Sequence, residues 1–210
     1  MDENTFFREV TLRITGDLEI EKALQDAFDF VRGVIPTDTM GLYFIDLDEE
    51  AIYSVARVGR HQAPAGFEEV APLAELDAEL VSMVQTIRRP EILPQDVFLL
   101  EELAAAPMLS PLIKRFTATE ASSTMILALR VREVLTGFLA VSADAPGAFT
   151  PEHAALLATV RDPVAIAVSN ARRYHETVQL KNLLEEDFRA MNQDLARISG
   201  LQPAACFCHV

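Results

Sequence analysis

The sequence predicts an α/β fold of the α+β kind, in which a central antiparallel sheet is flanked by helices near both ends of the chain. Two pairs of apolar segments, at 40–58 and 123–143, have the composition and the short polar connections of β-hairpins. The first 35 residues, and the residues after Thr150, repeat apolar side chains at helical spacing. These patterns together predict the sheet and its helices.

Two helices are expected in the first 35 residues. Phe6, Val10 and Ile14 recur at helical spacing in the first, with Asn4 or Thr5 as its N-cap. A second helix is predicted to start at Asp17 and to end between Gly33 and Pro36. Its apolar positions are Leu18, Ile20, Leu24, Phe28 and Val31.

Four segments are predicted to be strands. Met40–Leu47 is almost continuously apolar, and Ala51–Val58 follows it across a polar turn, so the two form a hairpin. Ser123–Val131 and Leu135–Ala143 form a second antiparallel pair around a short turn.

The chain between these hairpins is the hardest part to interpret. Leu73–Ile87 has helical spacing, and Val97–Ala106 and Met108–Phe116 are predicted as short helices after two interrupting prolines. A connection this long is either a lid-like functional insert or a poorly ordered segment.

A long helix closes the chain. Thr150 and Pro151 are a strong N-cap and first-turn pair, and Pro163 predicts a kink near Thr159. We expect residues 1–174 to form the main domain, 175–200 a signalling and dimerisation helix, and 201–210 a flexible tail.

The second half of this helix changes its apolar period to alternating steps of four and three. Such spacing is the seam of a coiled coil, and the alternative is an amphipathic helix packed on its own domain. The seam residues are Leu184, Phe188, Met191, Leu195 and Ile198.

The net charge of −14 argues against several partners, since an acidic surface repels nucleic-acid phosphates and anionic lipid. The apolar runs are far shorter than the roughly 20 residues of a membrane span. The N-terminus has no pattern of a secretory signal. We therefore expect a cytoplasmic protein that binds neither nucleic acid nor membrane directly.

No catalytic constellation stands out, so we do not expect an enzyme. The four histidines are scattered, and no nucleophile elbow or phosphate-binding glycine run occurs. Cys206, Cys208 and His209 could chelate zinc or copper or form a redox pair, but they lie at a terminus expected to fray. We predict no metal site and no identifiable cofactor.

The pattern of elements resembles the GAF domain over about residues 5–176. Ser123–Leu129 and Gly137–Val141 resemble the last two core strands of the family. Phe149–Glu152, Val164–Ala167 and Asn170–Arg172 resemble its closing helix. The resemblance implies terminal helices on one sheet face, a helical insert on the other, and a sensory role.

The helix after the domain is similar to signalling linkers of the family. Leu180–Ser199 resembles linkers in bacterial transcription activators that work with the alternative nitrogen-type sigma factor. The resemblance implies a homodimer that passes the state of an unknown small ligand to an output domain or a partner regulator. A ligand-free structural dimerisation module is the alternative.

Several branches of the family do not fit this sequence. No cysteine lies near the core to attach a bilin, and none precedes Cys206 to serve the free-methionine-sulfoxide reductase chemistry. The Asn-Lys-Phe…Asp-Glu signature of the cyclic-nucleotide branch is absent, and His61 is a weak candidate for a haem ligand.

The resemblance implies a ligand pocket on the sheet face opposite the terminal helices. Arg57 is the most informative candidate, because a charge on an apolar strand needs either an internal acid or an anionic ligand. The candidate pocket residues are Tyr43, Ile45, Tyr53, Val55, Arg57, Phe98, Met108, Phe116, Met125 and Leu127.

Overall fold

The computed structural model describes residues 1–17, 19–46, 51–60, 68–72, 97–100, 123–131 and 134–199. Its helices are α1 (Glu3–Ile14), α2 (Ile20–Val31), α5 (Pro151–Thr159) and α6 (Arg161–Ser199). Its strands are β1 (Thr39–Asp46), β2 (Ala51–Gly59), β3 (Glu68–Pro72), β4 (Val97–Leu100), β5 (Ser123–Val131) and β6 (Val134–Ala143). The chain divides into two units, Met1–Ala171 and Arg172–Val210, which are described separately.

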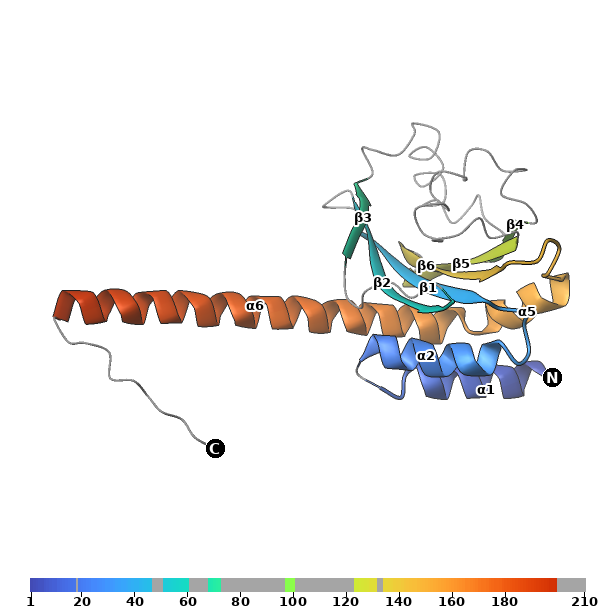
Figure 1. The fold of residues 1–210 in the computed structure, drawn as a ribbon. Helices are drawn as coiled ribbons and strands as arrows, with labels where there is room; N and C mark the ends of the chain where they lie inside the picture. Colours follow the sequence, from blue (N-terminus) through green and yellow to red (C-terminus); the bar gives the residue numbers. More distant parts are fainter. Residues whose placement is uncertain are drawn as a thin grey trace. The chain divides into compact units, whose positions relative to one another are not determined.

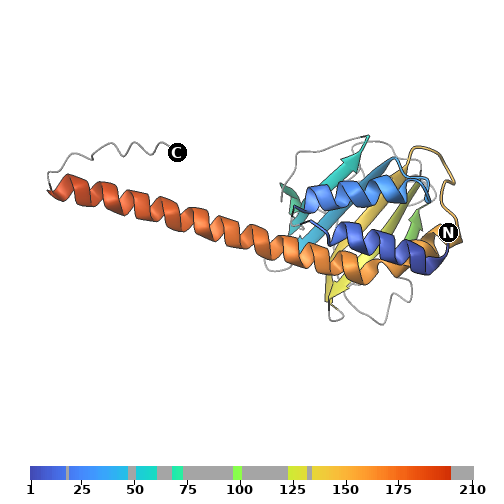
Figure 2. The ribbon, with the colours of Figure 1, turned by 90° about the horizontal axis from the view of Figure 1, so that it is seen from below.

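The first unit is a six-stranded sheet with helices on one face. The strand order is β3-β2-β1-β6-β5-β4, and each neighbouring pair is antiparallel. Helices α1 and α2 and the first turns of α6 lie across the same face of the sheet (Figures 1 and 2). This arrangement confirms the predicted fold class.

The main core lies between these helices and the sheet. Met40 and Leu42 of β1 and Leu139 of β6 are buried there together with Phe6 and Leu24 of the helices. Because side chains alternate along a strand, Tyr43 and its neighbours in register must lie on the opposite face.

The two N-terminal helices form as predicted, with shifted starts. Asp2, rather than Asn4 or Thr5, caps α1, and its Oδ1 accepts a hydrogen bond from the backbone N–H of Thr5 at 2.9 Å. Helix α2 begins at Ile20 instead of Asp17, because the Asp17 carboxylate accepts from the backbone N–H of Glu19 and so forms a turn before the helix.

The closing helix is broken near Thr159, where Pro163 led us to expect a kink. The Thr150 side chain accepts from the backbone N–H of His153, whose Nδ1 accepts in return from the N–H of Thr150. Helix α5 ends at Thr159, Val160 leaves the helical conformation, and α6 starts at Arg161. Pro163 explains the break, since its ring would meet the carbonyl of Thr159 in a continuous helix.

One part of the central prediction is wrong. Val97–Leu100 is strand β4, paired with β5, rather than the start of a helix. Strand β3 was also not predicted from the sequence. The predicted helices at 73–87 and 108–116, and the tail at 201–210, lie outside the described residues.

The second unit contributes the rest of α6. From Arg172 onward this helix carries large apolar side chains that are mostly exposed. They include Tyr174, Leu180, Leu183, Leu184, Phe188, Met191 and Leu195. Within the described part of the chain, no helix is both long and apolar enough to cross a membrane.

Candidate functional site

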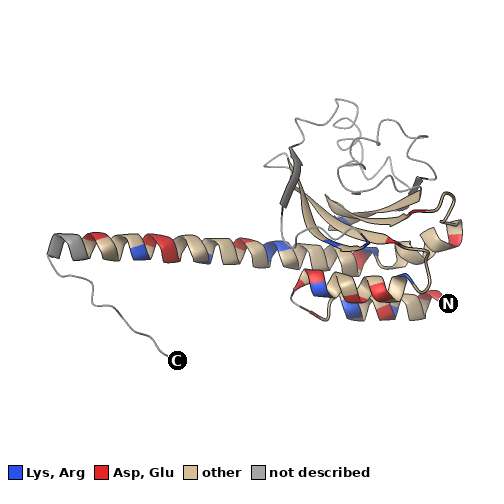
Figure 3. Cartoon of the chain, in the orientation of Figure 1, with Lys and Arg blue, Asp and Glu red and all other residues tan. Residues whose placement is uncertain are grey.

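The sheet face opposite the helices, called the far face below, is defined by strand register. Tyr43 of β1 lies opposite Phe138 of β6, and Gly41 lies opposite both Arg57 of β2 and Ala140 of β6. Directly opposed residues share a face, so these five side chains or glycine positions belong to the far face. Few charges lie on the strands compared with the helices (Figure 3), which makes Arg57 conspicuous.

A β-bulge in β2 corrects part of the predicted pocket. Leu42 pairs with Ala56 while Tyr43 pairs with Ser54, so Val55 is the extra residue. The bulge turns Val55 into the helix-side core, and Tyr53 packs against that core as well. The assignment of Tyr53 and Val55 to the far face is therefore wrong, whereas Arg57 beyond the bulge does lie there.

Two residues of β5 were also assigned to the wrong face. Met125 lies opposite Val141 and Leu127 lies opposite Leu139, and both are fully buried in the helix-side core. The far face of β5 is instead formed by Thr124, Ile126 and Ala128. The sequence did not reveal which face these two residues occupy, because their strand is largely apolar on both faces and shows no clear alternation.

Of the other candidates, Ile45 lies on the far face opposite Ile52, and both are buried outside the helix-side core. The side chain of Phe98 and the whole of Met108 and Phe116 lie outside the described residues. The structure thus brings Tyr43, Ile45 and Arg57 together on one face.

Tyr43 is the centre of this face. Its side chain is only 1% exposed, and its ring stacks on Phe138 with centroids 4.8 Å apart and planes 20° apart. The ring also lies over Gly41, where an added Cβ would stand 2.7 Å from the phenolic oxygen. Only glycine at position 41 leaves room for this ring position.

The phenol of Tyr43 interacts with the guanidinium of Arg57, which donates a hydrogen bond to it. Burial raises the pKa of Tyr43, and the nearby Arg57 offsets part of that rise. The phenol is therefore neutral near pH 7 and does not cancel the charge of the arginine.

Arg57 is incompletely satisfied within the described part of the chain. Its Nε is buried and has no hydrogen-bond partner, and no described carboxylate forms an ion pair with it. A buried N–H without a partner is uncommon in folded proteins and calls for a physical reason. The internal acid considered from the sequence is not found among the side chains that the structure describes, which exclude those of 68–72.

Buried hydroxyl groups extend this face, and the sequence analysis missed them. Thr124 and Ser142 lie opposite each other, and their side-chain oxygens are 3.1 Å apart. Ser54, opposite Tyr43, is also buried. Polar residues inside otherwise apolar strands were the available signal, since buried hydroxyls need partners.

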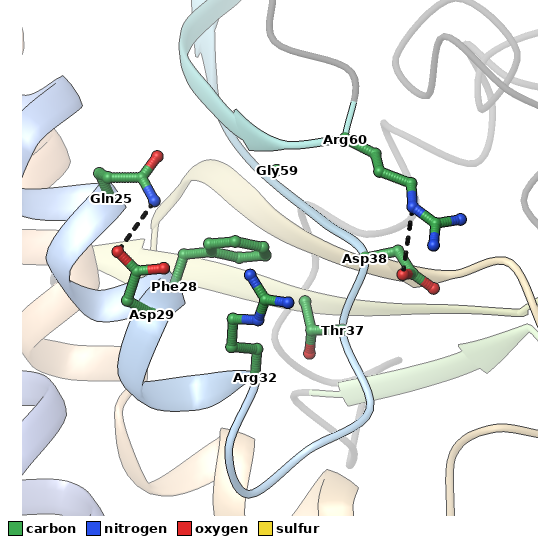
Figure 4. Close-up of a pocket in the computed structure, with 8 residues that line it drawn as sticks. All are labelled: Gln25, Phe28, Asp29, Arg32, Thr37, Asp38, Gly59 and Arg60. Atoms are coloured by element: carbon green, nitrogen blue, oxygen red, sulfur yellow. Dashed lines mark hydrogen bonds and ion pairs between the residues drawn. The ribbon is translucent and has the colours of Figure 1, made fainter.

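Apart from the far face, a hollow that we call the second hollow lies where α2 meets the start of β1 and the end of β2 (Figure 4). It has a volume of about 230 Å³ and was not predicted from the sequence. Its lining residues are Gln25, Phe28, Asp29, Arg32, Thr37, Asp38, Gly59 and Arg60.

The charges of this second hollow are largely paired internally. Arg60 bonds Asp144 at 2.6 Å and lies 3.9 Å from Asp38, and Gln25 bonds Asp29 at 3.1 Å. Arg32 points into the hollow with its guanidinium 5.5 Å from the Phe28 ring centre (Figure 4). Exposed groups of balanced charge make it a weaker ligand site than the far face.

Neither location has the ligand set of a metal centre. Among the residues that the structure describes, no group of three or more His, Cys, Asp or Glu could hold a metal ion. Cys206, Cys208 and His209 are not among those residues.

Comparison with known proteins identifies the fold. Neither a model of a known protein family nor a curated protein matches the sequence. Solved structures do match, with low sequence identity. One is the GAF domain of a phosphoenolpyruvate-protein phosphotransferase from Coxiella burnetii, with a TM-score of 0.58, 16% identity, and coverage of 83% of this chain and 96% of that one.

Two further solved structures of GAF domains have a similar fold. The GAF domain of the Acinetobacter phosphoenolpyruvate-protein phosphotransferase has a TM-score of 0.57 and 16% identity, covering 82% of this chain and 97% of that one. The phycocyanobilin-bound GAF domain of a cyanobacterial phytochrome has a TM-score of 0.57 and 14% identity, covering 83% and 98%. The chain therefore adopts the fold of a GAF domain.

Proposed function

We propose that this chain is a regulatory, non-enzymatic sensor that binds a small molecule on the far face of its sheet. The observation that carries the proposal is the buried polar group on that face, where Arg57 retains an unpartnered N–H beside Tyr43. The similar solved structures include GAF domains bound to phycocyanobilin and to phycoerythrobilin, which supports a ligand-binding role for this fold.

The proposed output element is α6, acting as a dimer. Leu184, Phe188, Met191 and Leu195 are each more than half exposed, and the side chain of Ile198 is outside the described residues. Contiguous exposed apolar side chains mark an interaction surface. Their alternating steps of four and three suit a second copy of the same helix, because matching knobs and holes then repeat along both chains.

The charges beside this seam favour a parallel pair. With Leu184 and Met191 at d positions, Asp187 and Asp194 fall at g, whereas Glu185 and Asn192 fall at e. Antiparallel helices would place g beside g and so bring acids together, while a parallel pair places Asp187 beside Asn192 of the other copy. A parallel dimer carries a shift at one end of both helices in the same direction, toward an output domain or partner regulator.

Native mass spectrometry of the purified full chain tests the sensor proposal. We expect a dimer that retains a small molecule, released when the protein is denatured. A screen of metabolite classes by thermal denaturation covers the case in which the ligand is lost on purification. A dimer that neither retains nor binds any small molecule would instead support the ligand-free dimerisation module.

A further inference from the structure

We propose that the ligand of the far face is an anion, carrying a carboxylate or phosphate group, and that Arg57 is the residue that anchors it. The inference rests on the proposed sensor function and names the chemical class of its ligand.

Arg57 belongs to a row of residues on the far face that runs across four strands. In register across the strands, Arg57 is followed by Gly41, then Ala140, then Ile126. The Tyr43 ring occupies the space above Gly41 in this row. Arg57 therefore stands next to that ring, and the small side chain of Ala140 follows on the other side of Gly41.

The described side chains supply no negative charge to Arg57. A guanidinium stays protonated at every accessible pH, and it offers five N–H donors. Tyr43 accepts one bond, but its neutral phenol supplies no negative charge. The buried Nε–H has no partner within the described part of the chain, so donor capacity and positive charge both remain.

Tyr43 fixes the position of the Arg57 guanidinium. The ring is held by its stacking on Phe138 and by its fit over Gly41. A guanidinium bonded to a fixed phenol loses less rotamer freedom on binding an anion, which favours a bidentate contact. Tyr43 therefore acts as a positioning residue for Arg57.

The competing explanation is an acid of the chain itself. Glu68 of β3 is one such acid, because its backbone lies opposite Ser54 on the strand next to Arg57, while its carboxylate lies outside the described side chains. If Glu68 neutralised Arg57, an external anion would compete with it and would bind better once it was removed. A Glu68→Gln variant therefore belongs in the test.

The test measures binding of benzoate, phenyl phosphate and neutral benzamide to the full chain by NMR titration. We expect one or both anions to bind and benzamide not to bind, and comparison of the two anions separates carboxylate from phosphate. Arg57→Gln should weaken anion binding about tenfold to a hundredfold, and Arg57→Lys should weaken it less. Tyr43→Phe should weaken binding while Arg57 keeps its charge.

Arg60→Gln is the matched control, because Arg60 directly follows the same strand and is paired with Asp144. Unchanged anion binding in Arg60→Gln supports the proposal. If Arg60→Gln loses anion binding and Arg57→Gln does not, the anion binds in the hollow lined by Arg32 and Arg60, and the proposal is overturned. Tighter anion binding in Glu68→Gln would show that Arg57 is neutralised internally, which also overturns it. Circular dichroism confirms that each variant folds.

The two proposals fail in different ways. A neutral molecule that native mass spectrometry finds bound equally in the wild type and Arg57→Gln would overturn the anion assignment and leave the sensor function standing. Absence of any bound or binding small molecule in the wild type would overturn both.

Discussion

Two glycines at the centre of the sheet each leave room for a part of Tyr43 that lies very close to them. Gly41 accommodates the Tyr43 ring, and a Cβ at Gly137 of β6 would overlap the carbonyl oxygen of Tyr43 itself. The second contact is with backbone, which cannot rotate away as a side chain can. Both glycines are thus required by packing rather than by a positive φ.

We predict that Gly137→Ala destabilises the protein by about 1–3 kcal/mol, the usual cost of overpacking. The free energy of unfolding from urea titration measures this effect. Gly33→Ala is the control, because a Cβ there would meet only the Phe30 carbonyl at 3.3 Å. Equal stability of Gly137→Ala and wild type would mean that β1 and β6 can separate without cost.

The pKa of Tyr43 predicts an alkaline limit to stability. Burial raises the pKa in the folded protein above the unfolded value of about 10. The folded state therefore holds this proton more tightly than the unfolded state does. The associated stability is fully present below the unfolded pKa and is lost as pH rises through the folded pKa.

Tyr43→Phe should remove this dependence, so the unfolding free energy of the variant should fall less between pH 9 and pH 11 than that of wild type. The difference between the two pH profiles is the measurement, since it cancels the titration of other groups. Tyr174→Phe is the control, because Tyr174 is 59% exposed. Parallel profiles for wild type and Tyr43→Phe would contradict the buried phenol.

At the scale of elements, the capping box of α5 is the clearest local determinant. Thr150 and His153 satisfy each other's backbone N–H groups at 3.4 and 3.2 Å. Thr150→Ala removes one acceptor and should cost about 1 kcal/mol in thermal or urea unfolding. Thr177→Ala, within α6 and exposed, should be neutral or slightly stabilising, and a similar loss in both variants would argue against a capping role.

The proposed α6 dimer predicts a specific pattern of disulfide cross-links. In a chain lacking Cys206 and Cys208 through serine substitutions, Leu184→Cys should cross-link two copies efficiently under mild oxidation. Only a parallel dimer brings the two copies of residue 184 together, because antiparallel helices pack d positions against a positions and would place residue 184 beside residue 195. Gel electrophoresis without reductant measures the product.

Glu186→Cys is the matched control, since residue 186 faces away from the seam. Comparable cross-linking at 184 and 186 would show that collision rather than a defined seam brings the helices together. Efficient linking between Leu184→Cys and Leu195→Cys chains, with none between two Leu184→Cys chains, would establish the antiparallel arrangement instead.

At the scale of the whole molecule, the first unit carries its own core. Residues 1–171 form one unit around the helix-side core, whereas the helix from Arg172 onward exposes its large apolar residues. A chain ending after Tyr174 should therefore fold, and it should be a monomer or a much weaker dimer. Analytical ultracentrifugation and circular dichroism measure both properties. An unchanged dimer would place the interface elsewhere, for example on the helices at residues 5–34.

The elements that depend on local patterns were predictable from the sequence. Phe6, Val10 and Ile14 line one side of α1 and are buried together, as their spacing predicts. The two hairpins and the helix start at Thr150 also follow from residues adjacent in the chain. Local periodicity and capping need no knowledge of distant contacts, so they determined the order of elements and, through it, the GAF fold.

Which side chains share the far face depended on tertiary structure. All eight residues of β1 are buried, so its sequence contains no alternation that marks a face. The bulge at Val55 reverses the faces of the residues before it, and pairing with β1 is what reveals it. Tyr43, Ile45 and Arg57 lie on the far face, whereas Tyr53, Val55, Met125 and Leu127 lie on the helix side. The sequence by itself thus determined the elements and singled out a charged residue within an apolar strand. Strand register decided that Arg57 faces Gly41 beside the Tyr43 phenol, because contacts across strands are set by pairing between distant residues.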